Sequence, residues 1–493
     1  MAAVPQFAFD NSYAQELDGF YVPWQGEAFP APQVVKLNTA LAAELGLDAA
    51  ALGSEAGAAV LSGALAPEGA SPLAMAYAGH QFGGFSPQLG DGRAILVGEM
   101  LDQAGQRRDL HLKGSGRTPF SRGGDGKAVL GPVLREYLMG EAMQALGIPT
   151  TRALAVTLTG ERVRRDGWEP GAVLARIASS HLRVGTFQFF AARGESAQVR
   201  KLADYAIARH DPDLVGKPEA YHAFLRRVMD RQARLIAQWM QVGFVHGVMN
   251  TDNMTLSGET IDYGPCAFID SYSETAVFSS IDRQGRYAFG NQPGIARWNL
   301  ARLAETMLPL LASDEDEAIR LATEDITAFG AQYEAYWLTG MRRKLGLAAQ
   351  AEAEADLDLV AGLYAVMEGQ GVDHTRLFRA MARRLEGDKS ALRSEFTDPE
   401  AIAEWEASWL ARITAQGGYN SGRAAAMDAV NPIYIPRNHL VEEALSAATK
   451  GDLAPFEALL SVLADPFTQR DGLERCAQPA PEDFGPYETF CGT

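Results

Sequence analysis

The chain of 493 residues is acidic, because 62 Asp and Glu residues against 44 Lys and Arg residues give a formal net charge of −18. This balance argues against a nucleic-acid-binding protein, whose surface usually carries excess positive charge. The three cysteines form no Cys-x-x-Cys pair and the eight histidines no His-Glu-x-x-His motif, which excludes a zinc ribbon and makes a histidine-based metal site unexpected.

No segment predicts export or membrane insertion. The first 24 residues carry Asp10, Glu16 and Asp18 and no long apolar run, unlike a signal peptide. Nowhere does the chain approach the ~20 consecutive apolar residues that cross a bilayer. We therefore expect a cytoplasmic protein with no membrane or nucleic-acid partner, and a monomer, although the sequence leaves the oligomeric state open.

The region before residue 180 predicts strands around one central helix. Residues 34–68, rich in Ala, Leu and Gly, predict short helices with breaks. Proline suits the first helical turn, so a helix is expected to begin near Pro132, and Gly147 with Pro149 is expected to end it. Short apolar runs predict four strands, over residues 94–97, 109–113, 152–159 and 172–178.

From about residue 195 the periodicity is helical. Over residues 220–242 the side chains of Phe224, Val228, Leu235 and Trp239 define one apolar face. Further helices are expected over residues 296–312, 314–346, 351–369, 374–385, 398–416 and 438–462, and the final thirty residues are Pro-rich and irregular. The order predicts an α+β fold with a boundary near residues 179–195.

One motif after the helix over 220–242 suggests a catalytic loop. His246-Gly247-Val248-Met249-Asn250-Thr251-Asp252-Asn253, followed by Asp262-Tyr263-Gly264, matches the kinase patterns His-Arg-Asp-x-x-x-x-Asn and Asp-Phe-Gly in order and spacing. Asn253 falls at the kinase offset, but the place of the kinase's catalytic aspartate holds Val248. Taken alone, both motifs could be simple turns; the kinase spacing favours a functional interpretation.

The residue types at this motif suit ATP chemistry. Asn253 and Asp262 offer a carbonyl and a carboxylate oxygen, the ligands that ATP-bound Mg²⁺ or Mn²⁺ accepts alongside phosphate oxygens. Val248 cannot accept a proton, whereas Asp252 can, so Asp252 is the candidate general base.

Upstream residues complete a candidate phosphate site. Gly90-Asp91-Gly92-Arg93 opens a strand and could present backbone N–H groups to phosphates. Lys113 ends a later strand, where kinases place a phosphate-binding lysine, and Glu136 on the following helix can pair with it. Each of these features alone is weak evidence for a phosphate site, but their order along the chain strengthens the prediction.

Three further features would add to the phosphate site, and two of them, Arg176 and Arg183, would form a local basic pocket with Lys113. Asp125-Gly126 precede the helix near Pro132, whose N-terminus favours anions. Arg176 and Arg183 flank the predicted boundary, and arginine clamps phosphate oxygens with a planar fork. The chain contains no Walker A motif, so a P-loop enzyme is not expected.

These motifs resemble the selenoprotein O family of protein adenylyltransferases, once called pseudokinases, along essentially the whole chain. The shared stretches are Gly79-His80-Gln81-Phe82-Gly83, Gln88-Leu89-Gly90-Asp91-Gly92-Arg93-Ala94, Leu112-Lys113-Gly114-Ser115-Gly116, the run from His246 to Met254, Asp262-Tyr263-Gly264-Pro265, Gly290-Asn291-Gln292-Pro293, Asn431-Pro432 and Pro436-Arg437-Asn438.

The resemblance implies a kinase-like fold of two lobes, residues 1–185 carrying the Gly loop, Lys strand and Glu helix, and residues 186–493 carrying the catalytic and metal-binding loops and the C-terminal tail. It implies ATP bound in inverted orientation, with AMP (or UMP from UTP) transferred to Ser, Thr or Tyr hydroxyls of target proteins and pyrophosphate released. It assigns nucleotide binding to Gly90, Gly92, Arg93, Lys113, Asp125, Gly126, Glu136, Arg176, Arg183 and Asp262, metal binding to Asn253 and Asp262, and the base to Asp252.

Two alternatives remain open at this point: an inactive nucleotide-binding scaffold, and an ordinary protein kinase, which Val248 disfavours. The target proteins, the acceptor hydroxyl and the choice of Mg²⁺ or Mn²⁺ are also undecided. The family implies redox pairing between activation-segment and C-terminal cysteines, in which Cys491 would replace a selenocysteine. A regulatory bond from Cys266 to Cys476 or Cys491 is therefore a hypothesis.

Overall fold

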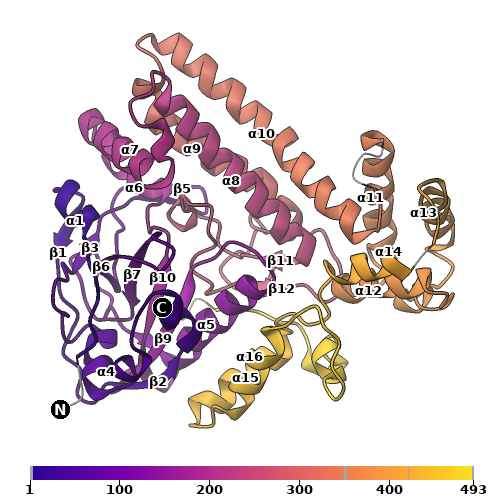
Figure 1. The fold of residues 1–493 in the computed structure, drawn as a ribbon, viewed down its shortest axis with the longest axis horizontal. Coiled ribbons are helices and arrows are strands. Elements are labelled where there is room, and N and C mark those ends of the chain that lie inside the picture. The colour runs from indigo at the N-terminus through magenta and orange to yellow at the C-terminus, as the bar shows by residue number, and fades with distance from the viewer. Residues whose placement is uncertain (1–3, 349–351, 420, 491–493) are drawn as a thin grey trace.

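The computed structural model describes residues 4–348, 352–419 and 421–490, and it confirms a mixed α+β fold. An antiparallel sheet dominates the N-terminal part and helices dominate the rest (Figure 1). The order of strands across the sheet is β1 (Tyr21–Pro23), β3 (Leu73–Met75), β6 (Ala94–Leu101), β7 (Arg107–Lys113), β10 (Trp168–Ala178), β9 (Arg152–Arg164) and β2 (Gln33–Leu37), with β8 (Ala128–Val129) pairing β10.

The two faces of the sheet differ in chemistry because side chains alternate along each strand. On one face Leu110 and Leu112 pack with Ile177 in a separate apolar cluster, next to α2 (Thr39–Glu44), α3 (Ala49–Leu52) and α4 (Glu55–Ser62). On the other face His111 lies opposite Arg176, and Lys113 follows two residues later. The register therefore gathers basic side chains on the face that looks away from the short helices.

Helix α5 (Leu130–Ala145) packs beside β9 and β10. It begins two residues before Pro132, after the extended residue Val129, and it ends as predicted, with Gly147 in the left-handed region at φ 75°. Glu136 lies on its buried side.

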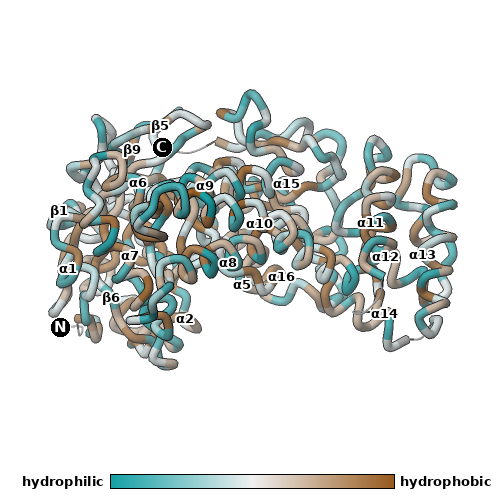
Figure 2. The backbone as a smooth tube through the Cα atoms, turned by 90° about the horizontal axis from the view of Figure 1, so that it is seen from above, coloured by the Kyte–Doolittle hydropathy of each residue, from teal (hydrophilic) through white to brown (hydrophobic). Residues whose placement is uncertain are grey.

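The helical part is built around long helices that pack against one another. Helices α8 (Ala220–Val242), α9 (Gln292–Leu311) and α10 (Glu315–Lys344) lie side by side, and α6 (Val184–Ala191) and α7 (Ser196–His210) connect them to the sheet (Figure 1). Four helices form the far end of the molecule, away from the sheet (Figure 2): α11 (Ala353–Met367), α12 (His374–Leu385), α13 (Ala403–Ala415) and α14 (Ser421–Asp428). None of the helices in the described part of the chain is both long and apolar enough to cross a lipid bilayer.

Several predicted boundaries need correction. The helix predicted over 438–462 is two helices, α15 (Asn438–Thr449) and α16 (Ala454–Leu463), because Gly451 takes φ 96° between them, outside the helical region. Residues 34–37, at the start of the region predicted to form short helices, belong instead to the strand β2. The strands β1, β3, β4 (Gly79–Gln81) and β5 (Gly84–Ser86) and the helix α14 were also not predicted. The start of the helix predicted over 351–369 lies partly outside the described residues, and its described part begins at Ala353.

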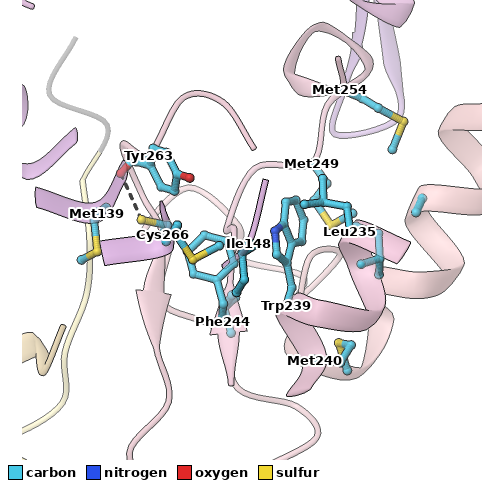
Figure 3. Packing of buried hydrophobic residues seen from close by; sticks show 14 of the residues in the cluster. Met139, Ile148, Leu235, Trp239, Met240, Phe244, Met249, Met254, Tyr263 and Cys266 are labelled. Carbon is cyan, nitrogen blue, oxygen red and sulfur yellow. Dashed lines mark hydrogen bonds between the residues drawn. The ribbon is translucent and has the colours of Figure 1, made fainter. Parts of the chain in front are cut away.

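The loop over residues 246–253, which the sequence predicts to be catalytic and which is called the catalytic loop below, lies against a buried cluster of aromatic and sulfur-containing side chains (Figure 3). The rings of Trp239 on α8 and Phe244 on β11 (Phe244–Val245) lie 5.3 Å and 6.3 Å from the ring of His246, the first residue of the loop. The His246 N–H donates to Gln292 Oε1 at 3.0 Å, and His246 Nε2 lies 2.9 Å from Ile261 O. The loop and the segment that carries Asp262 are thus fixed to one another and to the core.

Candidate functional site

A cavity of about 440 Å³ lies where the basic face of the sheet meets the catalytic loop. All but one of the predicted site residues line it: Gly90, Gly92, Arg93, Lys113, Asp125, Gly126, Arg176, Arg183, Asp252, Asn253 and Asp262. The exception is Glu136, which lies behind Lys113 in the cavity wall. Residues separated by up to 172 positions, Gly90 and Asp262, therefore share one site.

Glu136 holds two cations in place. Lys113 Nζ lies 2.6 Å from Glu136 Oε2, and Arg176 Nη1 lies 3.0 Å from Glu136 Oε1. Both cations also reach Asp262 Oδ1, at 2.6 Å from Lys113 and 2.8 Å from Arg176. Because the Arg176 side chain is 3% exposed and that of Lys113 11%, the positive charges are presented from a desolvated wall.

Asp262 is the centre of this charge cluster. Burial opposes its ionisation, but Lys113, Arg176 and Arg183 outweigh burial and hold the pKa of its carboxyl well below the usual range. Its backbone lies in the left-handed region at φ 62°, which costs free energy in a residue other than glycine and is often found at functional sites.

Arg183 joins the cluster to the catalytic loop. Its Nη1 donates to Asp252 O at 2.7 Å and lies 3.1 Å from Asp262 Oδ2. Its guanidinium lies 4.6 Å from the centre of the Tyr77 ring. Its Nε is buried without a hydrogen-bond partner among the described residues, so the donor capacity of the group is not fully used.

Asp252 and Asn253 lie on a short 3-10 turn, Thr251–Asn253. Asp252 Oδ2 accepts a hydrogen bond from Gln81 at 3.1 Å, whereas Oδ1 has no partner among the described residues. Burial raises the pKa of the Asp252 carboxyl to about 6, against the lowering effect of Arg183. The Asn253 amide nitrogen donates to Val248 O at 3.0 Å, so the carbonyl oxygen is the acceptor atom that remains on this side chain.

Steric contacts explain why glycine occupies two positions of the predicted phosphate loop. Gly90 takes φ 88°, and a Cβ there would lie 2.4 Å from Phe120 Cγ. A Cβ at Gly92 would lie 2.9 Å from Phe120 O. Asp125 accepts from Arg165 at 2.8 Å. Asp125-Gly126 precede α5, as predicted, but the strand β8 lies between them and the helix start at Leu130.

Behind the cations lies a buried polar network that sequence reasoning missed. Arg176 Nε donates to His111 Nδ1 at 3.2 Å, so the proton of His111 resides on Nε2, which faces Asp91 Oδ2 at 3.2 Å. Burial, with Arg176 and Arg183 nearby, holds the pKa of His111 well below its usual value, so the ring is neutral. Only the alternation of residues along β7 could have indicated that His111 faces the site.

Cys266 and Cys476 are both free thiols in the described residues, so a regulatory bond between them stays a hypothesis. Cys266 is buried, its thiol donates to Tyr263 O at 3.2 Å (Figure 3), and burial raises its pKa to about 11. Cys476 is a free thiol in a half-buried position. Cys491 lies outside the described residues, so the alternative bond to Cys491 stays a hypothesis.

Comparison with known proteins gives a consistent picture. The family model described as "Protein adenylyltransferase SelO" matches residues 4–464. A "Protein nucleotidyltransferase YdiU" of Cereibacter sphaeroides is 60% identical over 489 residues, covering 99% of this chain and 100% of the relative. Proteins of the same description from Mycolicibacterium paratuberculosis, 55% identical over 499 residues with both chains fully covered, and from Rhizobium etli, 54% identical over 491 residues, 99% of this chain and 97% of the relative, are also similar.

Proposed function

We propose how this chain, which belongs to the SelO family of protein adenylyltransferases, carries out nucleotidyl transfer with the residues of its cavity. The family implies ATP as the substrate and proteins as the targets. The proposal is that AMP passes to a hydroxyl side chain of the target and that pyrophosphate is released.

The observation that carries the proposal is the burial of three cations on one wall of the cavity. Arg176 and Arg183 are each 3% exposed, and Lys113 lies beside them. A desolvated cluster of this kind suits the most highly charged part of the nucleotide, its β- and γ-phosphates. The α-phosphate would then be left toward Asp252, the opposite orientation from an ordinary kinase.

In this orientation Asp252 acts as the general base. The hydroxyl oxygen of the target attacks the α-phosphorus, the bond from that phosphorus to the bridging oxygen breaks, and pyrophosphate departs with the electron pair. The hydroxyl proton passes to the carboxylate of Asp252, which lines the cavity. Val248, which lines the cavity at the place of the kinase aspartate, offers no acceptor.

The donor set also fits a divalent cation. The Asn253 carbonyl and the Asp262 carboxylate are hard oxygen ligands, and phosphate oxygens would complete the shell of Mg²⁺ or Mn²⁺. When bound, the cation neutralises charge on the phosphates. The described residues contain no group of three or more His, Cys, Asp or Glu that could hold a metal alone, in keeping with a site that needs the nucleotide.

The arrangement supports a kinase-like division of the chain into two lobes. We place the phosphate-binding strands and α5 in an N-terminal lobe, residues 1–185, and the catalytic and metal-binding loops in a C-terminal lobe, residues 186–493. Lys113 and Glu136 come from the first part and Asn253 and Asp262 from the second, and Lys113 Nζ joins the two parts by contacting Asp262 Oδ1 at 2.6 Å.

Intact-mass spectrometry after incubation with ATP and a divalent cation tests the proposal. We expect protein species heavier by one or more AMP units, and none heavier by a phosphate. Incubation with UTP tests the UMP alternative in the same assay. Phosphate additions would favour the kinase alternative, and unmodified protein with bound ATP would favour the scaffold.

A further inference from the structure

The hairpin formed by β4 and β5, residues Gly79–Ser86, lies against the catalytic loop, and neither the kinase comparison nor the proposed mechanism gives it a role. It contains the stretch Gly79-His80-Gln81-Phe82-Gly83. Its two-residue turn places Phe82 at φ 52° and Gly83 at φ 86°, and the strain lies at Phe82, because only glycine adopts a positive φ without cost. Strain of this kind persists only where surrounding contacts hold it in place.

The hairpin is bonded to successive residues of the catalytic loop. The Phe82 N–H lies 3.1 Å from Asn250 Oδ1, and the His80 N–H donates to Thr251 Oγ1 at 2.7 Å. Gln81 Nε2 donates to Asp252 Oδ2 at 3.1 Å. Three adjacent residues of the hairpin therefore fix three adjacent residues of the loop.

A helix holds the same contact from the other side. Thr251 Oγ1 donates to Gln188 Oε1 at 2.6 Å, and Gln188 Nε2 lies 2.8 Å from His80 Nδ1, so α6 closes a ring of hydrogen bonds around Thr251. The Ala78 N–H also donates to Gly185 O at 2.9 Å. The hairpin is thus a rigid support, as a positioning element must be.

The contact with Asp252 is close and directional. An ionised carboxylate only accepts hydrogen bonds, so the amide NH₂ of Gln81 must face it. A Cβ at Gly79 would lie 2.4 Å from Asp252 Oδ1, so this residue has no room for a side chain. One carboxylate oxygen is held by Gln81, while the other is left without a partner among the described residues.

We propose that Gln81 is a positioning residue for nucleotidyl transfer: it donates to Oδ2 of Asp252 and so fixes the orientation of the carboxylate toward the acceptor hydroxyl in the cavity. This inference rests on the proposed role of Asp252 as base. Gln81 itself takes no proton and forms no covalent bond. Its effect is on the turnover step and not on nucleotide binding, because the residues that hold the phosphates belong to other elements.

Two near-isosteric substitutions test the inference. Gln81→Met keeps the length of the side chain and removes the donor, and Gln81→Glu replaces the donor by a second carboxylate beside Asp252. We expect kcat to fall roughly 10- to 100-fold in Gln81→Met, the range for losing a hydrogen bond to a charged group, and at least as far in Gln81→Glu. KM for ATP should change by no more than about twofold, since the contacts proposed to bind the nucleotide are unchanged. Retained kcat in Gln81→Glu would overturn the inference.

The matched control is Ser86→Ala, which truncates a polar side chain on the same hairpin and does not line the cavity. It should keep the parent kcat. A comparable loss of kcat in Ser86→Ala would mean that the hairpin tolerates no change at all, and would contradict a specific role for Gln81.

A double-mutant comparison separates this inference from the proposed function. If Gln81 acts through Asp252, adding Gln81→Met to Asp252→Ala should cause no further loss of turnover. A further 10-fold loss would overturn the positioning role while leaving Asp252 as the base. If Asp252→Ala itself turned over normally, the proposed base would be wrong, and the positioning role with it.

Discussion

Replacing Asp262 with asparagine removes one charge from the centre of the site and keeps the size of the side chain. The surrounding cluster holds three cations, Lys113, Arg176 and Arg183, against two anions, Glu136 and Asp262. The substitution raises the excess positive charge of this buried group from one to two. ATP binding and turnover should therefore change in opposite directions.

Transfer should be almost abolished. The asparagine loses the only carboxylate proposed as a metal ligand, and charge stabilisation by a bound divalent cation contributes several kcal/mol to the transition state. We expect turnover to fall by about 10³-fold or more. ATP binding without metal should be retained or strengthened, because the cations lose a competing anion and remain free to hold phosphate.

The same substitution should destabilise the protein without nucleotide. Breaking a buried ion pair typically costs about 3–5 kcal/mol, because the remaining charges lose their partner. ATP should restore part of this loss by supplying the missing negative charge. Calorimetric titration, thermal unfolding with and without ATP, and turnover measure the three effects.

Asp213→Asn is the matched control for Asp262→Asn. Asp213 also pairs with an arginine, Arg227 at 2.6 Å, but its side chain is 56% exposed, and surface pairs contribute about 0–1 kcal/mol. It should leave turnover, ATP affinity and stability near the parent values. Turnover of Asp262→Asn within about tenfold of the parent would refute the reasoning, since one lost ligand should cost more.

Three more predictions test separate parts of the structure. Arg176→Met should weaken ATP about 10- to 100-fold but AMP hardly at all in binding assays, because Arg176 is proposed to hold the β- and γ-phosphates; equal losses would contradict the inverted orientation. Gly90→Ala should raise KM for ATP, since φ 88° and the 2.4 Å approach to Phe120 leave no room for a methyl group; an unchanged KM would show that the loop does not contact phosphates. Burial lowers the pKa of Lys344 to about 7 from 10.5, so the folded state binds fewer protons than the unfolded state between those values and stability rises with pH across that window. Lys344→Met should therefore increase the free energy of unfolding at pH 7 by up to roughly 4 kcal/mol, with a higher Tm, and should flatten the increase in stability between pH 7 and pH 10. A lower Tm in scanning calorimetry would contradict this.

The sequence was most informative where local signals repeat. The apolar face of α8 predicted that helix at its observed bounds, and the spacing from His246 to Asn253 predicted a loop that the structure places in the cavity wall. The alternation along β7 and β10 puts Lys113 and Arg176 on one face, so their meeting follows from strand register.

Other features could not be predicted from local patterns. Gln81 meets Asp252 across 171 positions, and β4 is three residues long, too short for a periodic signal. The split between α15 and α16 is different, because Lys450-Gly451-Asp452 is a recognisable turn sequence inside the predicted helix. Packing against α5, and not helical propensity, keeps both short helices in place.

The central claim is that the α-phosphorus of ATP is attacked and that the β- and γ-phosphates leave from the buried cations. Incubation of the protein and a target with ATP labelled separately at the α and γ positions tests it most directly. We predict that protein acquires label from the α position and none from the γ position, that the reaction needs a divalent cation, and that Asp262→Asn abolishes it. Transfer of γ label at a comparable rate would contradict the account and identify the chain as a kinase with an unusual base.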